Sequence, residues 1–182
     1  EALVMMLGSH NILGPKDGKP IVTPGQDMVM GNFYLTMEET KQELLEESQR
    51  YMDADCPKEA AAWKRYALNE GHVYSDVDEV MLAYQTGQVH LHSRIALPVK
   101  GMNKTSFNPV HENDYLITTV GKIIFNDMFP ADFPYLNEVS KENFEETPAK
   151  YFVKPGEDIK AYIEQLPIVD AVKKKDLGKV IA

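Results

Sequence analysis

The sequence predicts an α+β fold that is mostly helical and contains a few short strands. Apolar residues recur at one-turn spacing within residues 28–35 and 37–52, which is typical of amphipathic helices. Residues 89–99 instead alternate apolar and polar side chains, which is typical of a half-buried strand. No apolar run approaches the roughly 20 residues that a membrane-spanning helix needs.

Composition limits the classes of function. The chain has 182 residues, enough for one sizeable core or a core with an appendage, and its lone Cys56 excludes an internal disulfide and fits a reducing cytoplasm. The net charge of −9 is uneven, because residues 36–80 carry 12 acidic and 5 basic side chains. Such a segment repels phosphates, which argues against a self-sufficient nucleic-acid binder.

The two ends favour an internal piece of a longer protein over a processed mature chain. Residues 1–7 form a helix-forming run without a preceding N-cap, and Gly8 is expected as the C′ residue of that helix. Residues 177–182 are apolar and lack a stop signal.

The first half of the chain predicts turns followed by helices. Residues 11–27 are dense in proline and glycine and are expected to form turns around a short strand at residues 20–23. Asp27 is expected to cap a helix that ends near Leu35. Residues 36–39 match a capping box and Pro57 suits a helix first turn, so residues 37–71 predict a helical hairpin with an acidic outer face that ends at Gly71.

The second half predicts alternating strands and helices. The expected elements, in order, are a helix from Ser75 or Asp76 to Gly87, a strand over 89–99, a polar loop over 100–114, a strand over 115–118, a helix over 120–128 capped by Thr119, an irregular stretch over 131–155, and a helix over 157–165 that ends before Pro167.

His90 and His92 are the residues that most resemble the beginning of a metal site. On a strand they would share one face, about 7 Å apart. Zinc needs at least a third ligand, and the Arg94 cation on the same face disfavours a dication. We therefore expect no metal site and interpret these residues as a basic strip that faces solvent or an interface. No specific chemistry is indicated by the other polar features either, which are the acidic runs, Lys173–Lys175, Ser9-His10 and Gly14-x-x-x-Gly18.

Four separated blocks resemble one protein family. Residues 11–27, NILGPKDGKPIVTPGQD, resemble the segment that follows the catalytic loop in the largest (β′) subunit of bacterial RNA polymerases. The other blocks follow in the same order and are Gly31 with FYLT at 33–36, AYxxG at 83–87 with VHLHSR at 89–94, and TTVGKIIFN at 118–126 with FPY at 133–135. The C-terminal KKxxLG resembles the subunits of low-GC Gram-positive bacteria in particular.

The resemblance implies a fold and a location in the enzyme. Residues 1–27 would close the double-psi β-barrel that carries the active site, residues 28–150 would form the pore (funnel) domain, and residues 151–182 would extend it. The pore borders the secondary channel, through which nucleotides enter and backtracked RNA leaves. Many relatives have a shorter, glycine-containing connection at residues 40–72, which are therefore expected to form a peripheral insertion.

The resemblance also implies site residues and a cofactor. The aspartates that hold Mg²⁺ would precede residue 1, so we expect no catalytic residue and no activity in this chain alone. Gln26 would lie closest to substrate or RNA, because an amide makes hydrogen bonds without adding charge beside phosphates. Asn11, Pro24 and Asp27 would be structural residues near the active centre; for Gln26 and Asp27 the alternative is that they only fix the turn and cap the next helix.

The implied partners are the β, α, ω and σ subunits, template DNA, RNA and transcription factors that bind the secondary channel. The implied location is the cytoplasm, at the nucleoid, with no membrane contact. Two other functions stay open: a stand-alone acidic module that binds a protein, and a small zinc enzyme that uses His90 and His92. An Asp-x-Asp-x-Asp motif encoded directly upstream would decide for the polymerase.

Overall fold

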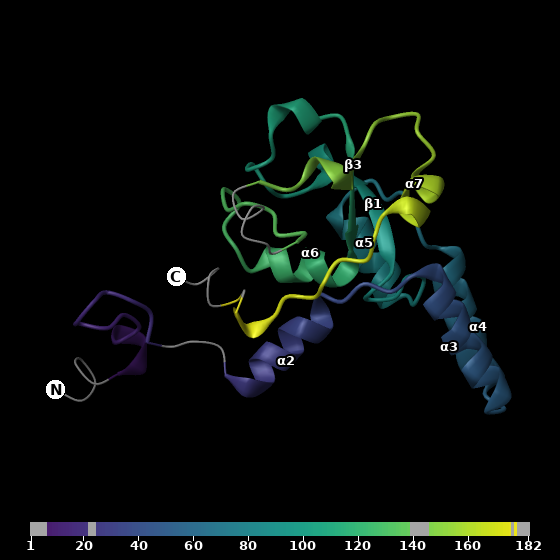
Figure 1. Ribbon diagram of the computed structural model, residues 1–182, viewed down its shortest axis with the longest axis horizontal. Helices are drawn as coiled ribbons and strands as arrows, with labels where there is room; N and C mark the ends of the chain where they lie inside the picture. Colours follow the sequence, from purple (N-terminus) through teal and green to yellow (C-terminus); the bar gives the residue numbers. More distant parts are fainter. Residues whose placement is uncertain (1–6, 22–24, 139–145, 176, 178–182) are drawn as a thin grey trace.

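The computed structural model describes residues 7–21, 25–138, 146–175 and 177. Figure 1 shows an elongated molecule, with residues 7–21 at one end, a pair of long helices at the other and a small sheet between them. The described α-helices are α2 (Gln26–Leu35), α3 (Lys41–Asp53), α4 (Pro57–Leu68), α5 (Val77–Gln85), α6 (Val120–Asp127) and α7 (Ile159–Gln165). The described strands are β1 (Arg94–Pro98), β2 (Tyr115–Thr119) and β3 (Phe152–Val153), and the architecture is α+β as predicted.

The sheet is antiparallel, with the strand order β1-β2-β3. Both of its faces are covered. Leu116 of β2 belongs to a core cluster that includes Val80 of α5 and Ile123 of α6, whereas its neighbour Ile117 packs with Ile163 of α7. Because successive side chains of a strand point to opposite faces, this arrangement places helices on both sides of the sheet.

The outer edge of β1 is also occupied. Backbone N–H groups of Gly71 and Tyr74 donate to the carbonyls of Arg94 and Ala96 at 2.8 and 3.0 Å, and the Ala96 N–H donates to the His72 carbonyl at 3.0 Å. The segment that follows α4 therefore lies along β1 on the side away from β2.

Helices α3 and α4 form the predicted hairpin, which projects from the body in Figure 1. Pro57 occupies the first turn of α4, as its fixed φ favours. Ser48 Oγ donates to the Ala60 carbonyl at 2.8 Å, and the rings of Tyr51 and Trp63 stack at 6.2 Å. The two helices thus hold each other along their length.

Two helix starts differ from the prediction. The capping box of α3 is formed by Thr40 and Glu43, not by residues 36–39. Both segments have the Thr-x-x-Glu spacing, but Thr36 follows the last residue of α2, where its hydroxyl donates to the Asn32 carbonyl at 2.8 Å. Asp27 is not the N-cap of α2 either, because the helix already begins at Gln26 after Gly25.

The predicted strand over residues 89–99 is much shorter, because β1 begins only at Arg94. Its partner β2 ends at Thr119, which pairs with Arg94, and the chain then turns into α6. Residues before Arg94 therefore have no partner in β2. They form a turn in which the Ser93 N–H donates to the His90 carbonyl at 3.2 Å.

The other predictions had mixed outcomes. The helix starts at Asp76 and Thr119 are confirmed, since each side chain accepts a hydrogen bond from a backbone N–H of the next turn. The stretch predicted as irregular contains β3. Residues 1–6 and 22–24 lie outside the described part, while Gly8 begins a 3-10 helix and Pro20 forms an isolated bridge with Leu13. In the described part, no helix has the length and apolar character needed to cross a membrane.

Candidate functional site

Gln26 and Asp27 open helix α2, and both side chains are exposed. Gly25 takes the N-cap position in an extended conformation, and no side chain caps the helix. The Asp27 carboxylate in the first turn favours the helix through its interaction with the positive end of the macrodipole. The amide of Gln26 is thus presented at the start of a helix that leaves it open to solvent.

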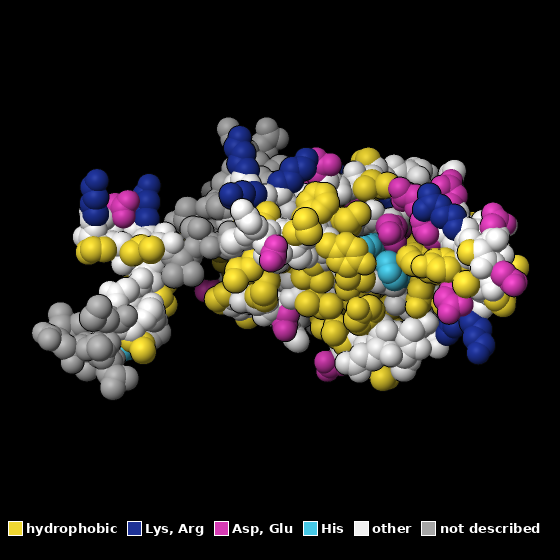
Figure 2. Space-filling view, turned by 90° about the horizontal axis from the view of Figure 1, so that it is seen from below, with side chains coloured by type: hydrophobic (Ala, Val, Ile, Leu, Met, Phe, Trp, Pro, Cys, Tyr) yellow, Lys and Arg dark blue, Asp and Glu magenta, His cyan; other side chains and the backbone are white. Residues whose placement is uncertain are grey.

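Helix α2 exposes much of its apolar surface. It contains no fully buried residue, and its Met28, Met30, Phe33 and Tyr34 are all exposed, Met30 to 72%. Figure 2 shows hydrophobic side chains gathered in the middle of the face seen from below, the side on which α2 lies in Figure 1. Large exposed apolar patches occur at surfaces that bind other proteins, membranes or ligands.

Asn11 and Pro24 belong to the segment before α2. Asn11 is exposed and donates from its side-chain amide to the Leu7 carbonyl at 3.2 Å. The turn that follows is held by backbone bonds from Gly14 to Lys19, at 2.7 Å, and from Ile21 to Ile12, at 2.8 Å. Pro24 lies outside the described residues.

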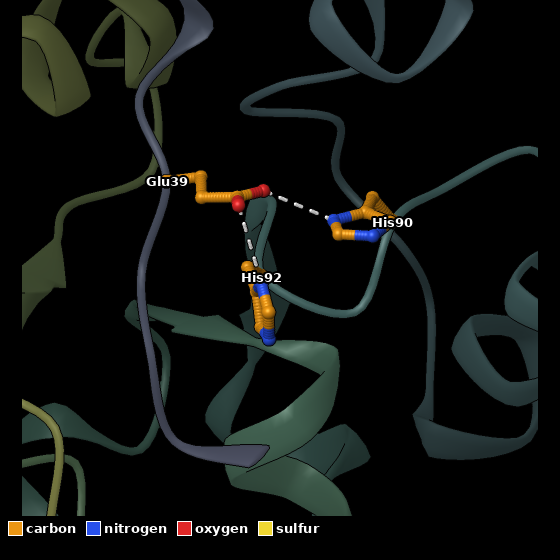
Figure 3. Close-up of side chains that lie close together, drawn as sticks. All are labelled: Glu39, His90 and His92. Atoms are coloured by element: carbon orange, nitrogen blue, oxygen red, sulfur yellow. Dashed lines mark ion pairs between the residues drawn. The ribbon is translucent and has the colours of Figure 1, made fainter. Parts of the chain in front are cut away.

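The structure brings His90 and His92 together with Glu39, although all three lie outside regular elements (Figure 3). The Nδ1 atom of His90 lies 3.1 Å from one carboxylate oxygen of Glu39, and Nδ1 of His92 lies 3.4 Å from the other. The two imidazole rings are 5.0 Å apart at their centroids and almost perpendicular. We call these three residues the Glu-His-His cluster.

Aromatic rings surround this cluster. His92 is 1% exposed and meets the ring of Tyr34 edge-on at 4.6 Å. His90 is partly buried against Trp63 and Tyr66 of α4, at 4.7 and 5.4 Å. The cluster thus lies where the helical hairpin, the end of α2 and the turn before β1 meet.

The cluster has an unusual charge balance. Burial raises the pKa of Glu39, but its contacts with His90 and His92 outweigh this effect and bring the pKa down to about 2. Even so, Glu39 Oε2, His90 Nδ1 and both ring nitrogens of His92 have no hydrogen-bond partner in the described part of the chain. The carboxylate is therefore held as an anion beside imidazole nitrogens whose bonding is incomplete.

Sequence reasoning missed Glu39 and misplaced Arg94. Glu39 was assigned to a capping box, and its distance of more than fifty residues from the histidines gives no signal of contact. Arg94 does not share a solvated face with the histidines. It is buried, its Nε lies 3.1 Å from Glu70 Oε1, and Nη1 donates to the Leu166 carbonyl at 3.0 Å.

A second buried ion pair joins Lys122 of α6 to Glu38. Both side chains are almost inaccessible to solvent. Burial lowers the pKa of Lys122, and the neighbouring Glu38 carboxylate opposes that shift. Partners this far apart in sequence are not predictable from local patterns.

Comparison with known proteins places the chain in a family. The family model described as RNA polymerase Rpb1, domain 3, matches residues 11–182. Among curated proteins, the chain is 46% identical to the DNA-directed RNA polymerase subunit beta′ of Listeria monocytogenes serovar 1/2a and 44% identical to that of Bacillus subtilis strain 168.

Both alignments cover 100% of this chain but only 13% of the relative, so the chain spans about an eighth of the length of these subunits. The family match includes all four blocks identified in the sequence, the turn before β1 and α2 among them. The chain belongs to the RNA polymerase Rpb1 domain 3 family and corresponds, over its whole length, to a part of bacterial β′ subunits.

Proposed function

We propose that this chain forms the pore (funnel) region of the β′ subunit of a DNA-directed RNA polymerase, where it lines the secondary channel used by nucleotides and by backtracked RNA. The observation that supports this most is the family match over residues 11–182. Residues 1–27 would complete the double-psi barrel, and the remainder would form the channel wall. The chain would then work at the nucleoid, in contact with template DNA and RNA within the whole enzyme.

The proposed role is structural and positioning, because the chain lacks the residues that would hold catalytic Mg²⁺. The sequence contains no Asp-x-Asp-x-Asp motif, and the paired acidic residues Asp76 and Glu79 lie at the start of α5, where the Asp76 side chain accepts from the Glu79 N–H. The metal-dependent chemistry of nucleotidyl transfer would therefore rest on aspartates elsewhere in the parent enzyme.

The exposed apolar side chains of α2 support a position inside a large assembly. Exposed apolar surface costs free energy in water, roughly 25 cal/mol per Å². The exposed apolar side chains of α2 are Met28, Met30, Phe33 and Tyr34. Adjacent parts of β′, or the β, α, ω and σ subunits, are the candidates that would cover them. Factors that bind the secondary channel would meet the acidic hairpin instead.

Gln26 is the residue proposed to act nearest to substrate. It is exposed at the start of α2, and an amide there could hydrogen-bond to a nucleotide or to the RNA 3′ end without repelling phosphate. Gln26→Ala in the whole polymerase should remove one polar contact worth about 1–3 kcal/mol and slow nucleotide addition or RNA cleavage by roughly five- to more than a hundredfold.

The test compares Gln26→Ala with Gln49→Ala, an identical chemical change on the exposed surface of α3. Elongation and cleavage rates are measured on assembled enzymes in vitro, and subunit assembly is checked for both. The control should behave as wild type. If the two variants are equally active, Gln26 has no role near substrate. If a β′ subunit that carries this sequence does not assemble into a polymerase at all, the acidic protein-binding module is favoured instead.

A further inference from the structure

We propose that Glu39, His90 and His92 bind one Zn²⁺ ion at the base of the helical hairpin. Two imidazoles and a carboxylate form one of the ligand sets that zinc uses in proteins, and nitrogen donors favour zinc over Mg²⁺ or Ca²⁺. One donor atom from each of the three residues lies within 4.8 Å of the other two. Figure 3 shows both imidazoles with their Nδ1 atoms turned toward the carboxylate.

Two of the donor separations are close to those in a site that holds a small tetrahedral ion. With metal–ligand bonds of roughly 2.0–2.1 Å, neighbouring donors in a tetrahedral zinc site are about 3.3 Å apart. The nitrogen–oxygen separations here are 3.1 Å for His90 and 3.4 Å for His92. The two contacts use different oxygens of Glu39, so an ion between the rings could be bound by either oxygen or by both. Solvent would supply the fourth ligand from the partly exposed side of Glu39 and His90.

A second observation is that these donors are buried without hydrogen-bond partners. His92 is 1% exposed, and neither of its ring nitrogens has such a partner among the described residues. His90 Nδ1 and Glu39 Oε2 lie 3.1 Å apart, but neither atom makes a hydrogen bond of normal geometry among the described residues. A buried polar atom without a partner costs about 1–3 kcal/mol. A cation between the three side chains would satisfy three of these atoms at once.

The backbone holds the donors in place before any ion binds. The Glu39 N–H donates to the His92 carbonyl at 3.1 Å, and the Ser93 N–H closes the turn back to His90. Glu39 also forms an isolated bridge with Ser93. The three side chains are thus fixed relative to one another by main-chain bonds that do not depend on the metal.

The surroundings do not oppose a dication. The sequence argued against zinc because it showed only two ligands and placed Arg94 beside them. In the structure Glu39 is the third ligand, and Arg94 is paired with Glu70. The other nearby buried cation, Lys122, is paired with Glu38. Residues 36–80 carry an excess of acidic side chains, and the resulting negative potential attracts cations.

The proposed ion would act as a structural staple. Glu39 precedes α3, and the two histidines precede β1, so one ion would join the base of the hairpin to the sheet. The rings of Trp63 and Tyr66 pack against His90 and cover the side of the site that faces α4. This role is independent of whether the parent protein is a polymerase.

The test measures bound zinc in the full-length protein that contains this chain. Wild type, Glu39→Gln and His90→Ala are loaded with ZnCl₂, dialysed and analysed for metal, and the difference between wild type and variant cancels any zinc held elsewhere. His72→Ala, which changes an exposed histidine outside the cluster, is the matched control. We expect each cluster variant to hold one zinc fewer than wild type and to bind zinc at least about tenfold more weakly, with no loss in the control.

A second readout identifies the ligands. Co²⁺ in place of zinc should give the visible absorption of a tetrahedral nitrogen–oxygen site in wild type and in His72→Ala, but not in Glu39→Gln. Far-ultraviolet circular dichroism confirms that the variants are folded without metal. Equal zinc content in wild type and in the folded variants would overturn the proposal and leave the cluster as a plain ion pair. If His90→Ala does not fold, the comparison with Glu39→Gln decides.

Discussion

Gly121 lies where three segments of the backbone approach one another closely. It lies in the first turn of α6, and its N–H donates to the Leu91 carbonyl at 3.0 Å. A Cβ atom at this position would overlap the Leu35 carbonyl at the end of α2 and would lie 3.4 Å from the Leu91 carbonyl. Because both obstacles are main-chain atoms, a side chain here requires the backbone to move.

We therefore expect Gly121→Ala to destabilise the protein by about 1–3 kcal/mol through overpacking. Gly31→Ala is the matched control, because Gly31 is also a helical glycine but has open space around its Cβ position. That change should stabilise by roughly 0.5–1 kcal/mol, since alanine favours helix more than glycine. Urea denaturation of both variants measures the two shifts, and shifts of the same sign would contradict the close approach.

At the scale of elements, one part of the helical hairpin can be removed from the protein body, and another part belongs to that body. Helices α3 and α4 hold each other through Ser48, Tyr51 and Trp63. The residues just after α4 instead belong to the body: the Glu70 carboxylate pairs with the buried Arg94, and Gly71 bonds to β1. The boundary of the removable part is therefore Leu68, not residue 72 as the sequence suggested.

Replacing residues 41–68 with a short glycine-containing linker should keep the fold and the activity of the parent enzyme, because closing a surface loop costs little entropy. Removing residues 40–72 should cost about 3–5 kcal/mol more, since Arg94 then stays buried without its carboxylate. Thermal unfolding and in vitro transcription by the two assembled enzymes give the comparison. Loss of activity in the shorter deletion would show that the hairpin takes part in the working channel.

Elements fixed by local chemistry were predictable from sequence, and those fixed by distant partners were not. Thr119, Asp76 and Pro57 mark helix starts through groups only a few residues away. The strand at 89–99 was overestimated because alternation does not show where the partner strand ends. The family resemblance could be identified from four blocks of sequence. The Glu-His-His cluster could not be predicted, because Glu39 and His90 lie on opposite sides of the hairpin in the sequence and come together only in the folded chain.

At the scale of the whole molecule, residues 36–38 contact segments from the second half of the chain through side-chain bonds. Glu38 pairs with Lys122 of α6 and accepts from the Val169 N–H at 3.2 Å. Two residues earlier, Thr36 Oγ1 accepts from the Val172 N–H at 2.8 Å. The C-terminal segment after α7 is thereby bound along the junction between α2 and α3.

Glu38→Ala should destabilise the protein by about 3–5 kcal/mol, because it leaves the Lys122 ammonium buried without a counter-ion. Glu112→Ala, which breaks the exposed pair with Lys100, should cost less than about 1 kcal/mol. Urea denaturation at neutral pH measures both, and equal losses would mean that Lys122 is solvated.

The Glu38→Ala defect should shrink as the pH is raised. Burial holds the pKa of Lys122 below its ordinary value of 10.5, so the unfolded chain binds more protons than the folded one between the two values, and stability rises with pH in that window. Without Glu38, the carboxylate that raises this pKa is gone and the window widens. Glu112→Ala should show no such recovery.

The segment along the outer side of β1 has a consequence for the behaviour of the protein in concentrated solution. A strand at the border of a sheet offers unpaired N–H and carbonyl groups to any other chain, and it is a common starting point for aggregation. Here residues 71–74 already occupy those groups on β1. The stretch that leads out of the hairpin thus keeps strands of neighbouring molecules from pairing with β1, and its detachment would expose that edge of the sheet to them.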